Sequence, residues 1–158
     1  MSNKQKIVTS LWFGNNAEEA VNFYISVFPD SRIKQVSRFG PGGHMPEGSL
    51  LSASFELNGV EFMALNGAPA GFSETASLMV SCDSQEEIDA YWQKLSTGGE
   101  EGQCGWLKDK FGLSWQIVPS MLGEMMSGGD TARTSRVVNA FLQMKKFDIR
   151  ALEAAYGA

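Results

Sequence analysis

The 158-residue sequence is poor in the features that build disulfide frameworks and membrane spans. It has two cysteines, Cys82 and Cys104, which are too few for a disulfide framework and fit two free thiols in a reducing compartment. No apolar run approaches the roughly 20 residues that cross a bilayer, and no apolar segment follows the charged start of the chain. We therefore expect a cytoplasmic protein with no membrane partner.

Positive charge is also scarce. Lysine and arginine together number 13 against 18 aspartates and glutamates, which gives a formal net charge of -5. Proteins that bind nucleic acids usually carry a basic face, and the densest basic cluster here is the pair Lys145-Lys146. The sequence therefore predicts no nucleic-acid partner.

One pattern occurs twice along the chain. Residues 17–24 and 85–92 both begin with acidic residues and continue with apolar residues at helical spacing. Acidic residues in a first turn suit the positive end of the helix dipole. The sequence predicts two equivalent helices, the first capped by Asn15 or Asn16 and the second by Asp83 or Ser84.

Each predicted helix follows an apolar strand and precedes further strands. The strands before the helices are Ile7 to Phe13 and Ala76 to Cys82. Leu50 to Leu57 alternates as a strand does, and Asn58-Gly59 is a hairpin signal because both residues tolerate positive φ. The remaining predicted strands are Val60 to Asn66, a strand within Glu101 to Leu107, and Leu113 to Val118. The pattern predicts an α+β fold with two βαβββ repeats, in residues 1–66 and 74–119.

Residues 120–158 have a helical pattern. We expect helices over Ser120 to Met126, Asp130 to about Met144, and Asp148 to Tyr156, with Ser120, Asp130 and Asp148 as N-caps. These helices would form an extension of the same compact unit that covers the domain or a partner subunit.

The duplicated pattern and its local motifs resemble a known superfamily. The chain is similar to the PhnB-like group, labelled 3-demethylubiquinone-9 3-methyltransferase-like, of the glyoxalase/bleomycin-resistance/dioxygenase (vicinal oxygen chelate) superfamily. The resemblance implies that both repeats form a curved, half-open mixed sheet around a pocket, and it implies a homodimer. The matching segments are residues 11–14, 17–20, 23–24, 27–29, 64–67, 104–109, 111–112, 114–119 and 142–146.

The same resemblance implies where a metal ion would bind. Metal-using members hold one divalent ion with His, Glu or Asp side chains, two from each repeat. Alignment of the two helices matches Thr9 with Ser77, and alignment of Gly59 with Gly112 matches Met63 with Gln116. None of these four residues is a charged or imidazole ligand, which a hard divalent ion requires, and a slip of one residue supplies none. We therefore expect no metal site and no cofactor.

Strand alternation predicts a pocket face with apolar and hydrogen-bonding side chains. An ordinary filled core is the alternative. The candidate ligand-binding residues are Leu11, Phe13, Met63, Leu65, Ser77, Met79, Trp106, Ser114 and Gln116.

Two further residues are candidates for chemistry. Cys104 lies four residues before Lys108, whose ammonium could activate the thiol, but most such cysteines are small buried residues. The single histidine, His44, lies in a Gly/Pro-rich loop, where it is either solvated or able to reach the pocket.

The sequence leaves open whether the protein is an enzyme. The first hypothesis is a protein that binds a small molecule, and the alternative is a glyoxalase- or dioxygenase-like enzyme, with Glu56 and Glu61 as the nearest acids. A third hypothesis is a domain that only mediates assembly. No G-x-G-x-x-G motif is present, so the sequence offers no S-adenosylmethionine-binding loop to support the methyltransferase label.

Overall fold

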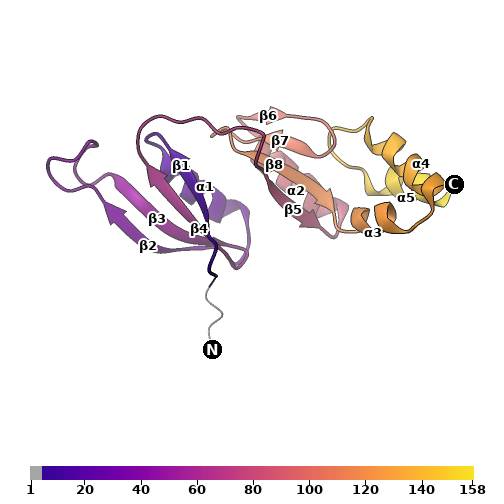
Figure 1. Cartoon of the computed structure of the whole chain (residues 1–158), viewed down its shortest axis with the longest axis horizontal. Coiled ribbons are helices and arrows are strands. Elements are labelled where there is room, and N and C mark those ends of the chain that lie inside the picture. Colours follow the sequence, from indigo (N-terminus) through magenta and orange to yellow (C-terminus); the bar gives the residue numbers. More distant parts are fainter. Residues whose placement is uncertain (1–4) are drawn as a thin grey trace. The chain divides into compact units, whose positions relative to one another are not determined.

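A computed structural model describes residues 5–158 of the chain (Figure 1). The chain divides into two compact units, Met1–Gly71 and Phe72–Ala158. Each unit has one four-stranded mixed sheet and one long helix in the same order along the chain, and further helices end the second unit. The predicted α+β class, the two βαβββ repeats and the C-terminal helices are therefore confirmed.

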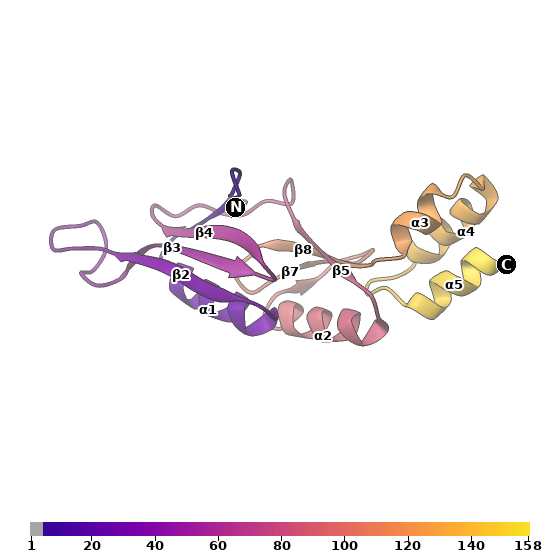
Figure 2. The same cartoon turned by 90° about the horizontal axis from the view of Figure 1, so that it is seen from below.

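The first unit contains five regular elements. Its sheet has the order β1-β4-β3-β2, in which β1 runs parallel to β4 and the other neighbours are antiparallel. Figure 2 shows the helix α1 lying along one face of this sheet. The elements are β1 (Thr9–Phe13), α1 (Ala17–Val27), β2 (Arg32–Arg38), β3 (Leu50–Leu57) and β4 (Val60–Asn66).

The register of the first sheet separates a covered face from an open face. Leu11 lies beside Ala64, and Ala64 lies beside Ala53, all three at most 5% exposed. Neighbouring residues in register point to the same face, so these side chains pack under α1. Ser10 and Met63 are partners on the opposite, open face.

Two asparagines shape this unit. Asn58 and Gly59 have φ values of 47° and 79°, as a tight hairpin turn requires, so the predicted turn is confirmed. Asn66 is buried: its Oδ1 accepts a hydrogen bond from the Ala17 backbone N–H at 2.9 Å, and its Nδ2 donates to the Leu50 carbonyl at 2.9 Å. Asn66 therefore caps α1, where Asn16 makes no side-chain capping bond.

The second unit repeats this arrangement with the order β5-β8-β7-β6. The strand expected within Glu101 to Leu107 is instead two strands joined by residues 102–105. Cys104 and Gly105 have φ values of 55° and 81°, which break a continuous strand there. The elements are β5 (Leu78–Cys82), α2 (Gln85–Ser96), β6 (Glu100–Glu101), β7 (Trp106–Lys108) and β8 (Ser114–Pro119).

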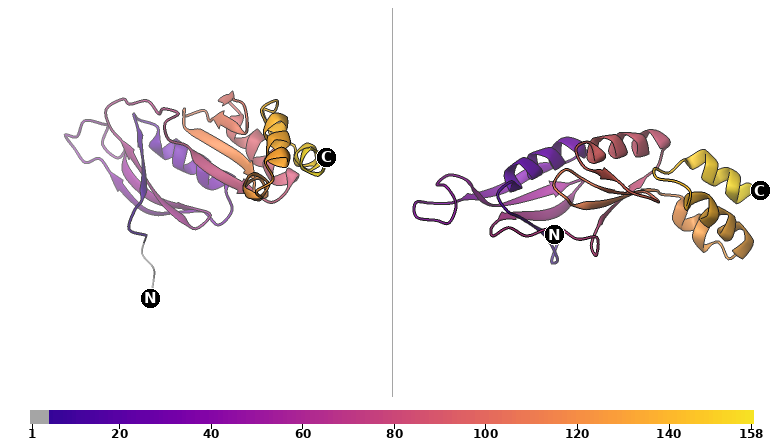
Figure 3. Two further views of the ribbon diagram at one scale, coloured as in Figure 1. Left: turned by 45° about the vertical axis from the view of Figure 1, so that its right-hand side comes forward. Right: turned by 90° about the horizontal axis from the view of Figure 1, so that it is seen from above.

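Three helices complete the second unit: α3 (Leu122–Ser127), α4 (Thr131–Phe141) and α5 (Ile149–Gly157) (Figure 3). Asp130 and Asp148 accept hydrogen bonds from backbone N–H groups of the first turns, as predicted. Ser120 is not a cap, because its N–H still bonds the Cys82 carbonyl and α3 begins later. Among residues 5–158, none of the helices combines the length and apolar character of a membrane span.

The segment between α4 and α5 is fixed to the rest of the unit by backbone hydrogen bonds. The N–H groups of Cys104 and Gly105 donate to the carbonyls of Met144 and Lys145 at 2.8 and 2.7 Å. Gln85 adds two bonds, from its Nε2 to the Phe147 carbonyl and from the Ile149 N–H to its Oε1. The C-terminal helices therefore support the connection between β6 and β7.

Candidate functional site

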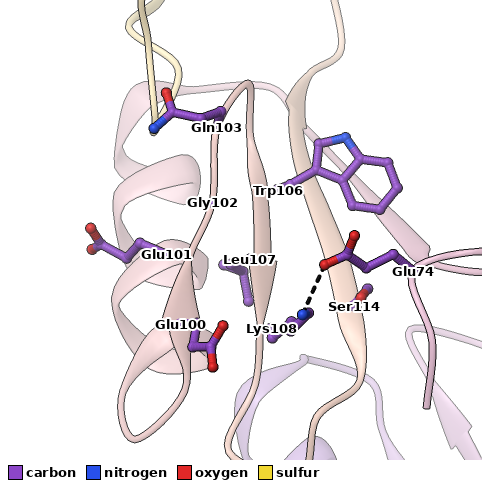
Figure 4. A pocket seen from close by; sticks show the side chains of 9 residues that line it. All are labelled: Glu74, Glu100, Glu101, Gly102, Gln103, Trp106, Leu107, Lys108 and Ser114. Atoms are coloured by element: carbon purple, nitrogen blue, oxygen red, sulfur yellow. Dashed lines mark ion pairs between the residues drawn. The ribbon is translucent and has the colours of Figure 1, made fainter.

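A pocket of about 260 Å³ lies over strands β6, β7 and β8 of the second unit. Figure 4 shows its side chains, which come from the three strands, from the β6–β7 connection and from the segment before β5. Lys108 and Ser114 are partners in the sheet register, and Trp106 shares their face. The lining residues are Glu74, Glu100, Glu101, Gly102, Gln103, Trp106, Leu107, Lys108 and Ser114.

Ser114 is the buried polar residue of this pocket. Its side chain is 1% exposed, and its Oγ has no hydrogen-bond partner among residues 5–158. A buried hydroxyl without a partner is unfavourable by about 1–3 kcal/mol. The hydroxyl can both donate and accept a hydrogen bond.

Lys108 carries the positive charge of the pocket. Its Nζ lies 2.8 Å from Oε1 of Glu74, an ion pair that Figure 4 marks with a dashed line. The hydrogen bond and charge of Glu74, with a further contribution from Glu100, raise the pKa of Lys108, and Lys108 in turn lowers the pKa of Glu74. Lys108 therefore stays protonated at neutral pH and does not act as a general base for the Ser114 hydroxyl.

Five predicted ligand-binding residues belong to this part of the molecule. Trp106 is the register partner of Gln116, and Gln116 is the partner of Met79. Gln116 also donates a hydrogen bond from Nε2 to Oγ of Ser77 at 2.9 Å. The structure therefore brings Ser77, Met79, Trp106 and Gln116 to the face that carries Ser114, and two of the five, Trp106 and Ser114, line the pocket.

The first unit does not bring its four predicted residues together. Leu11 and Phe13 are 5% and 2% exposed on the face under α1, whereas Met63 and Leu65 lie on the open face. The expected common face is therefore wrong. The connection before α1 spans residues 14–16, one residue longer than 83–84 before α2, so alignment by the helices shifted the first strand by one position.

The same shift corrects one of the expected metal positions. In the first unit the open-face partner of Met63 is Ser10, in place of Thr9. In the second unit Ser77 stays on the open face, where its Oγ accepts from Gln116, and the register partner of Gln116 is Met79. Hydroxyl, thioether and amide groups do not fit a divalent ion that prefers carboxylate and imidazole ligands. Within residues 5–158 no three His, Cys, Asp or Glu side chains gather as a metal site would require.

Neither unit has the type of sheet that usually binds S-adenosylmethionine, the methyl donor of such reactions. Each sheet contains a single parallel strand pair, so neither is the doubly wound parallel sheet that usually binds this cofactor. Gly40, Gly42 and Gly43 lie in the loop between β2 and β3, which opens no helix.

Cys104 and His44 both lie outside the lining of the pocket. The Cys104 thiol donates to the Phe141 carbonyl at 3.6 Å, and Lys108, its expected activator, is paired with Glu74. His44 is exposed in the β2–β3 loop. The geometry supports a structural role for Cys104 in the β6–β7 connection.

Cys82 is expected to resist alkylation in the native protein. It is fully buried, and burial, with smaller contributions from the charges of Glu87 and Asp83, raises the pKa of its thiol to about 12. At pH 8 only about one molecule in ten thousand then carries the reactive thiolate. Mass spectrometry after iodoacetamide treatment should find Cys82 unmodified until urea is added. Rapid modification of Cys82 without urea would show that the thiol is not buried.

Sequence reasoning missed Glu74, Glu100 and Asp109. Glu100 opposes Lys108 across two short strands that were predicted as one, which hid the opposite-charge pair. Glu74 lies in a loop, where no periodicity indicates its direction. Asp109, before Phe111-Gly112, is a turn-forming aspartate whose pattern could have been recognised.

A family model described as 3-demethylubiquinone-9 3-methyltransferase matches residues 5–118. A solved structure from Bacillus cereus, a PhnB protein described as a candidate 3-demethylubiquinone-9 3-methyltransferase, is 40% identical with a TM-score of 0.68. That match covers 73% of this chain and 99% of the other. No curated protein matches the chain.

More distant structures share the fold. Protein PA1353 from Pseudomonas aeruginosa is 20% identical with a TM-score of 0.62, over 73% of this chain and 98% of the other. The fosfomycin resistance protein FosX from Listeria monocytogenes, complexed with Mn(II) and sulfate, is 14% identical with a TM-score of 0.56, over 81% of this chain and 98% of the other. The chain thus belongs to the family described as 3-demethylubiquinone-9 3-methyltransferase, which the similar PhnB protein also represents, and it shares its fold with FosX.

Proposed function

We propose that this protein binds a small organic molecule in the pocket over β6, β7 and β8, without the aid of a divalent metal ion. The observation that carries the proposal is the Ser114 hydroxyl, which is buried at this pocket without a partner among residues 5–158. Buried polar groups are normally paired, so an unpaired one that lines a pocket indicates a missing hydrogen-bond partner.

The pocket suits a ligand of modest size. Its volume of about 260 Å³ is slightly below the range of roughly 300–1,000 Å³ that holds drug-sized molecules. Trp106 supplies apolar surface, while Gln103, Lys108 and Ser114 supply polar groups that can fix an orientation. This combination favours a molecule with a single ring, or another metabolite of that size.

Binding is favoured over catalysis by the groups that the pocket contains. A hydroxyl nucleophile needs an adjacent base, and protonated Lys108 is not one. The metal chemistry of the superfamily would need ligands that Ser10, Met63, Met79 and Gln116 do not supply. The homodimer and the cytoplasmic location implied above stay predictions.

The replacement Ser114→Ala tests the proposal because stability and binding should change in opposite directions. Without ligand, removal of an unpaired buried hydroxyl should leave the melting temperature unchanged or raise the free energy of unfolding by about 1 kcal/mol. Affinity for a fragment that binds the pocket should fall about fivefold, as the loss of one hydrogen bond predicts. Thermal unfolding and a nuclear magnetic resonance titration with a fragment library measure the two effects.

Ser81→Ala is the matched control. Ser81 is exposed on β5 and does not line the pocket, so its replacement should change neither quantity. If Ser114→Ala binds the fragments as tightly as the wild-type protein does, the Ser114 hydroxyl does not contact the ligand, and the proposal fails.

A further inference from the structure

We propose that the pocket selects a molecule with a protonated amine next to an aromatic ring, an inference that rests on the proposed function. It goes further by naming the charge and shape of the ligand. Three features support it: an excess of carboxylates, an indole ring in the wall, and the Ser114 hydroxyl that lacks a partner among residues 5–158.

The lining residues carry more negative than positive charge. Glu74, Glu100 and Glu101 stand against Lys108, so the lining has a formal charge of -2. Glu101 is partly engaged elsewhere, because its Oε1 accepts a hydrogen bond from Nε1 of Trp92 at 2.9 Å. Even without Glu101 the remaining side chains carry a charge of -1, which a monovalent cation would neutralise.

Glu100 is the carboxylate that remains available. It lies opposite Lys108 in the register of β6 and β7 and contributes to the raised pKa of that lysine. Its carboxylate makes no hydrogen bond or ion pair with another residue between 5 and 158, whereas Glu74 is paired with Lys108 at 2.8 Å. An incoming ammonium could pair with Glu100 and leave the Glu74–Lys108 pair intact.

Trp106 offers the aromatic surface. It is partly exposed in the pocket wall, and its backbone is fixed because its carbonyl accepts from the Gly102 N–H at 2.8 Å. The face of an indole attracts cations and stacks on flat rings. Figure 4 shows the Trp106 ring on the same side of the strands as Glu74, Lys108 and Ser114.

Ser114 adds a neutral hydrogen-bonding group on the same face, two strands away from Glu100. A protonated amine pairs with the carboxylate, and the hydroxyl can bond to another polar atom of the ligand. An anionic ligand would instead compete with Glu74 for Lys108 and would face Glu100. The charges therefore favour an amine over a carboxylate of the same size.

Three single-ring probes of similar size test the charge preference: benzylamine, benzyl alcohol and benzoate. Each is titrated into the full-length ¹⁵N-labelled protein at pH 7, and the resonances of residues 100–116, with the Trp106 indole N–H, report binding. We expect benzylamine to bind about fivefold more tightly than benzyl alcohol, as one partly exposed charge pair predicts, and benzoate to bind most weakly. Added salt should weaken the binding of benzylamine alone.

The variant Glu100→Gln should remove the advantage of benzylamine, so that its affinity falls about fivefold to that of benzyl alcohol. Glu86→Gln, an exposed glutamate of α2 outside the pocket, is the matched control and should keep the wild-type order. If benzyl alcohol or benzoate binds as well as benzylamine, the inference is overturned while the proposed function stands. If no probe shifts these resonances, both are overturned.

Discussion

Replacement of Asp109 by alanine is expected to lower the free energy of unfolding by about 4 kcal/mol, because three buried or partly buried donors lose their acceptor. Asp109 is 2% exposed at the turn between β7 and β8. Its Oδ1 accepts from the N–H groups of Phe111 and Leu113 at 2.8 and 3.1 Å, and its Oδ2 accepts from Nε1 of Trp115 at 2.9 Å. Urea unfolding followed by circular dichroism measures the change.

Two variants separate these bonds. Asp109→Asn keeps an oxygen for the two backbone donors but turns an amide N–H₂ toward the Trp115 indole N–H, so about half of the loss should remain. In a Trp115→Phe background that conflict is absent, so Asp109→Asn should lower the free energy of unfolding clearly less than it does in the wild-type protein. Stability of Asp109→Ala within 1 kcal/mol of wild type would contradict this account of the turn.

The Asp109 turn also bears on the pocket. Lys108 and Ser114 are register partners directly on either side of it, so the turn sets the distance between the ammonium and the buried hydroxyl. The turn therefore positions two of the groups that line the pocket.

The variant Gly105→Ala is expected to lower the free energy of unfolding by about 3 kcal/mol, because overpacking and an unfavourable backbone conformation act together. Gly105 has a φ of 81°, and a Cβ there would contact Cε2 of Phe147 and lie 2.7 Å from the Ile117 carbonyl oxygen. The backbone cannot move aside easily, because the Gly105 N–H donates to Lys145 and its carbonyl accepts from the Ile117 N–H at 2.8 Å. Chemical denaturation of the variant measures the loss.

Gly112→Ala is the matched control for this variant. Gly112 has a similar φ of 87°, but nothing lies within 4 Å of the position of a Cβ. Its replacement should lower the free energy of unfolding by only about 1 kcal/mol, because alanine disfavours the positive φ. The difference between the two variants then measures how tightly the segment before α5 packs on the β6–β7 connection. Equal losses would show that the packing of Phe147 is loose.

Local signals in the sequence predicted the elements well. Alternation located β3 and β4 at their observed bounds, Asn58-Gly59 gave the hairpin, and Asp130 and Asp148 gave two helix starts. These features depend on neighbouring residues only. The face to which the β1 side chains point could not be predicted from neighbouring residues. The connection before α1 is one residue longer than the connection before α2, so alignment by the helices predicted Leu11 and Phe13 on the wrong face of the sheet.

The pocket was only partly predictable for a related reason. Ser114 follows from alternation within its own strand, Trp106 was a candidate as an aromatic ring that can line a cavity, and both line the pocket. Glu74 reaches Lys108 from a loop 34 residues earlier in the chain, and no periodic pattern predicts such a pair. The absence of a partner for Ser114 among residues 5–158 is a property of the packed sheet, which sequence alone does not contain.

The most direct test of the central claim is a benzylamine titration of the labelled protein after exhaustive dialysis against a chelator. A metal-independent site over β6, β7 and β8 predicts shifts of the Trp106 indole N–H and of Ser114 that are unchanged when Mn²⁺ or Mg²⁺ is restored. Shifts that appear only after the metal returns, or that leave these two residues unaffected, would contradict the account.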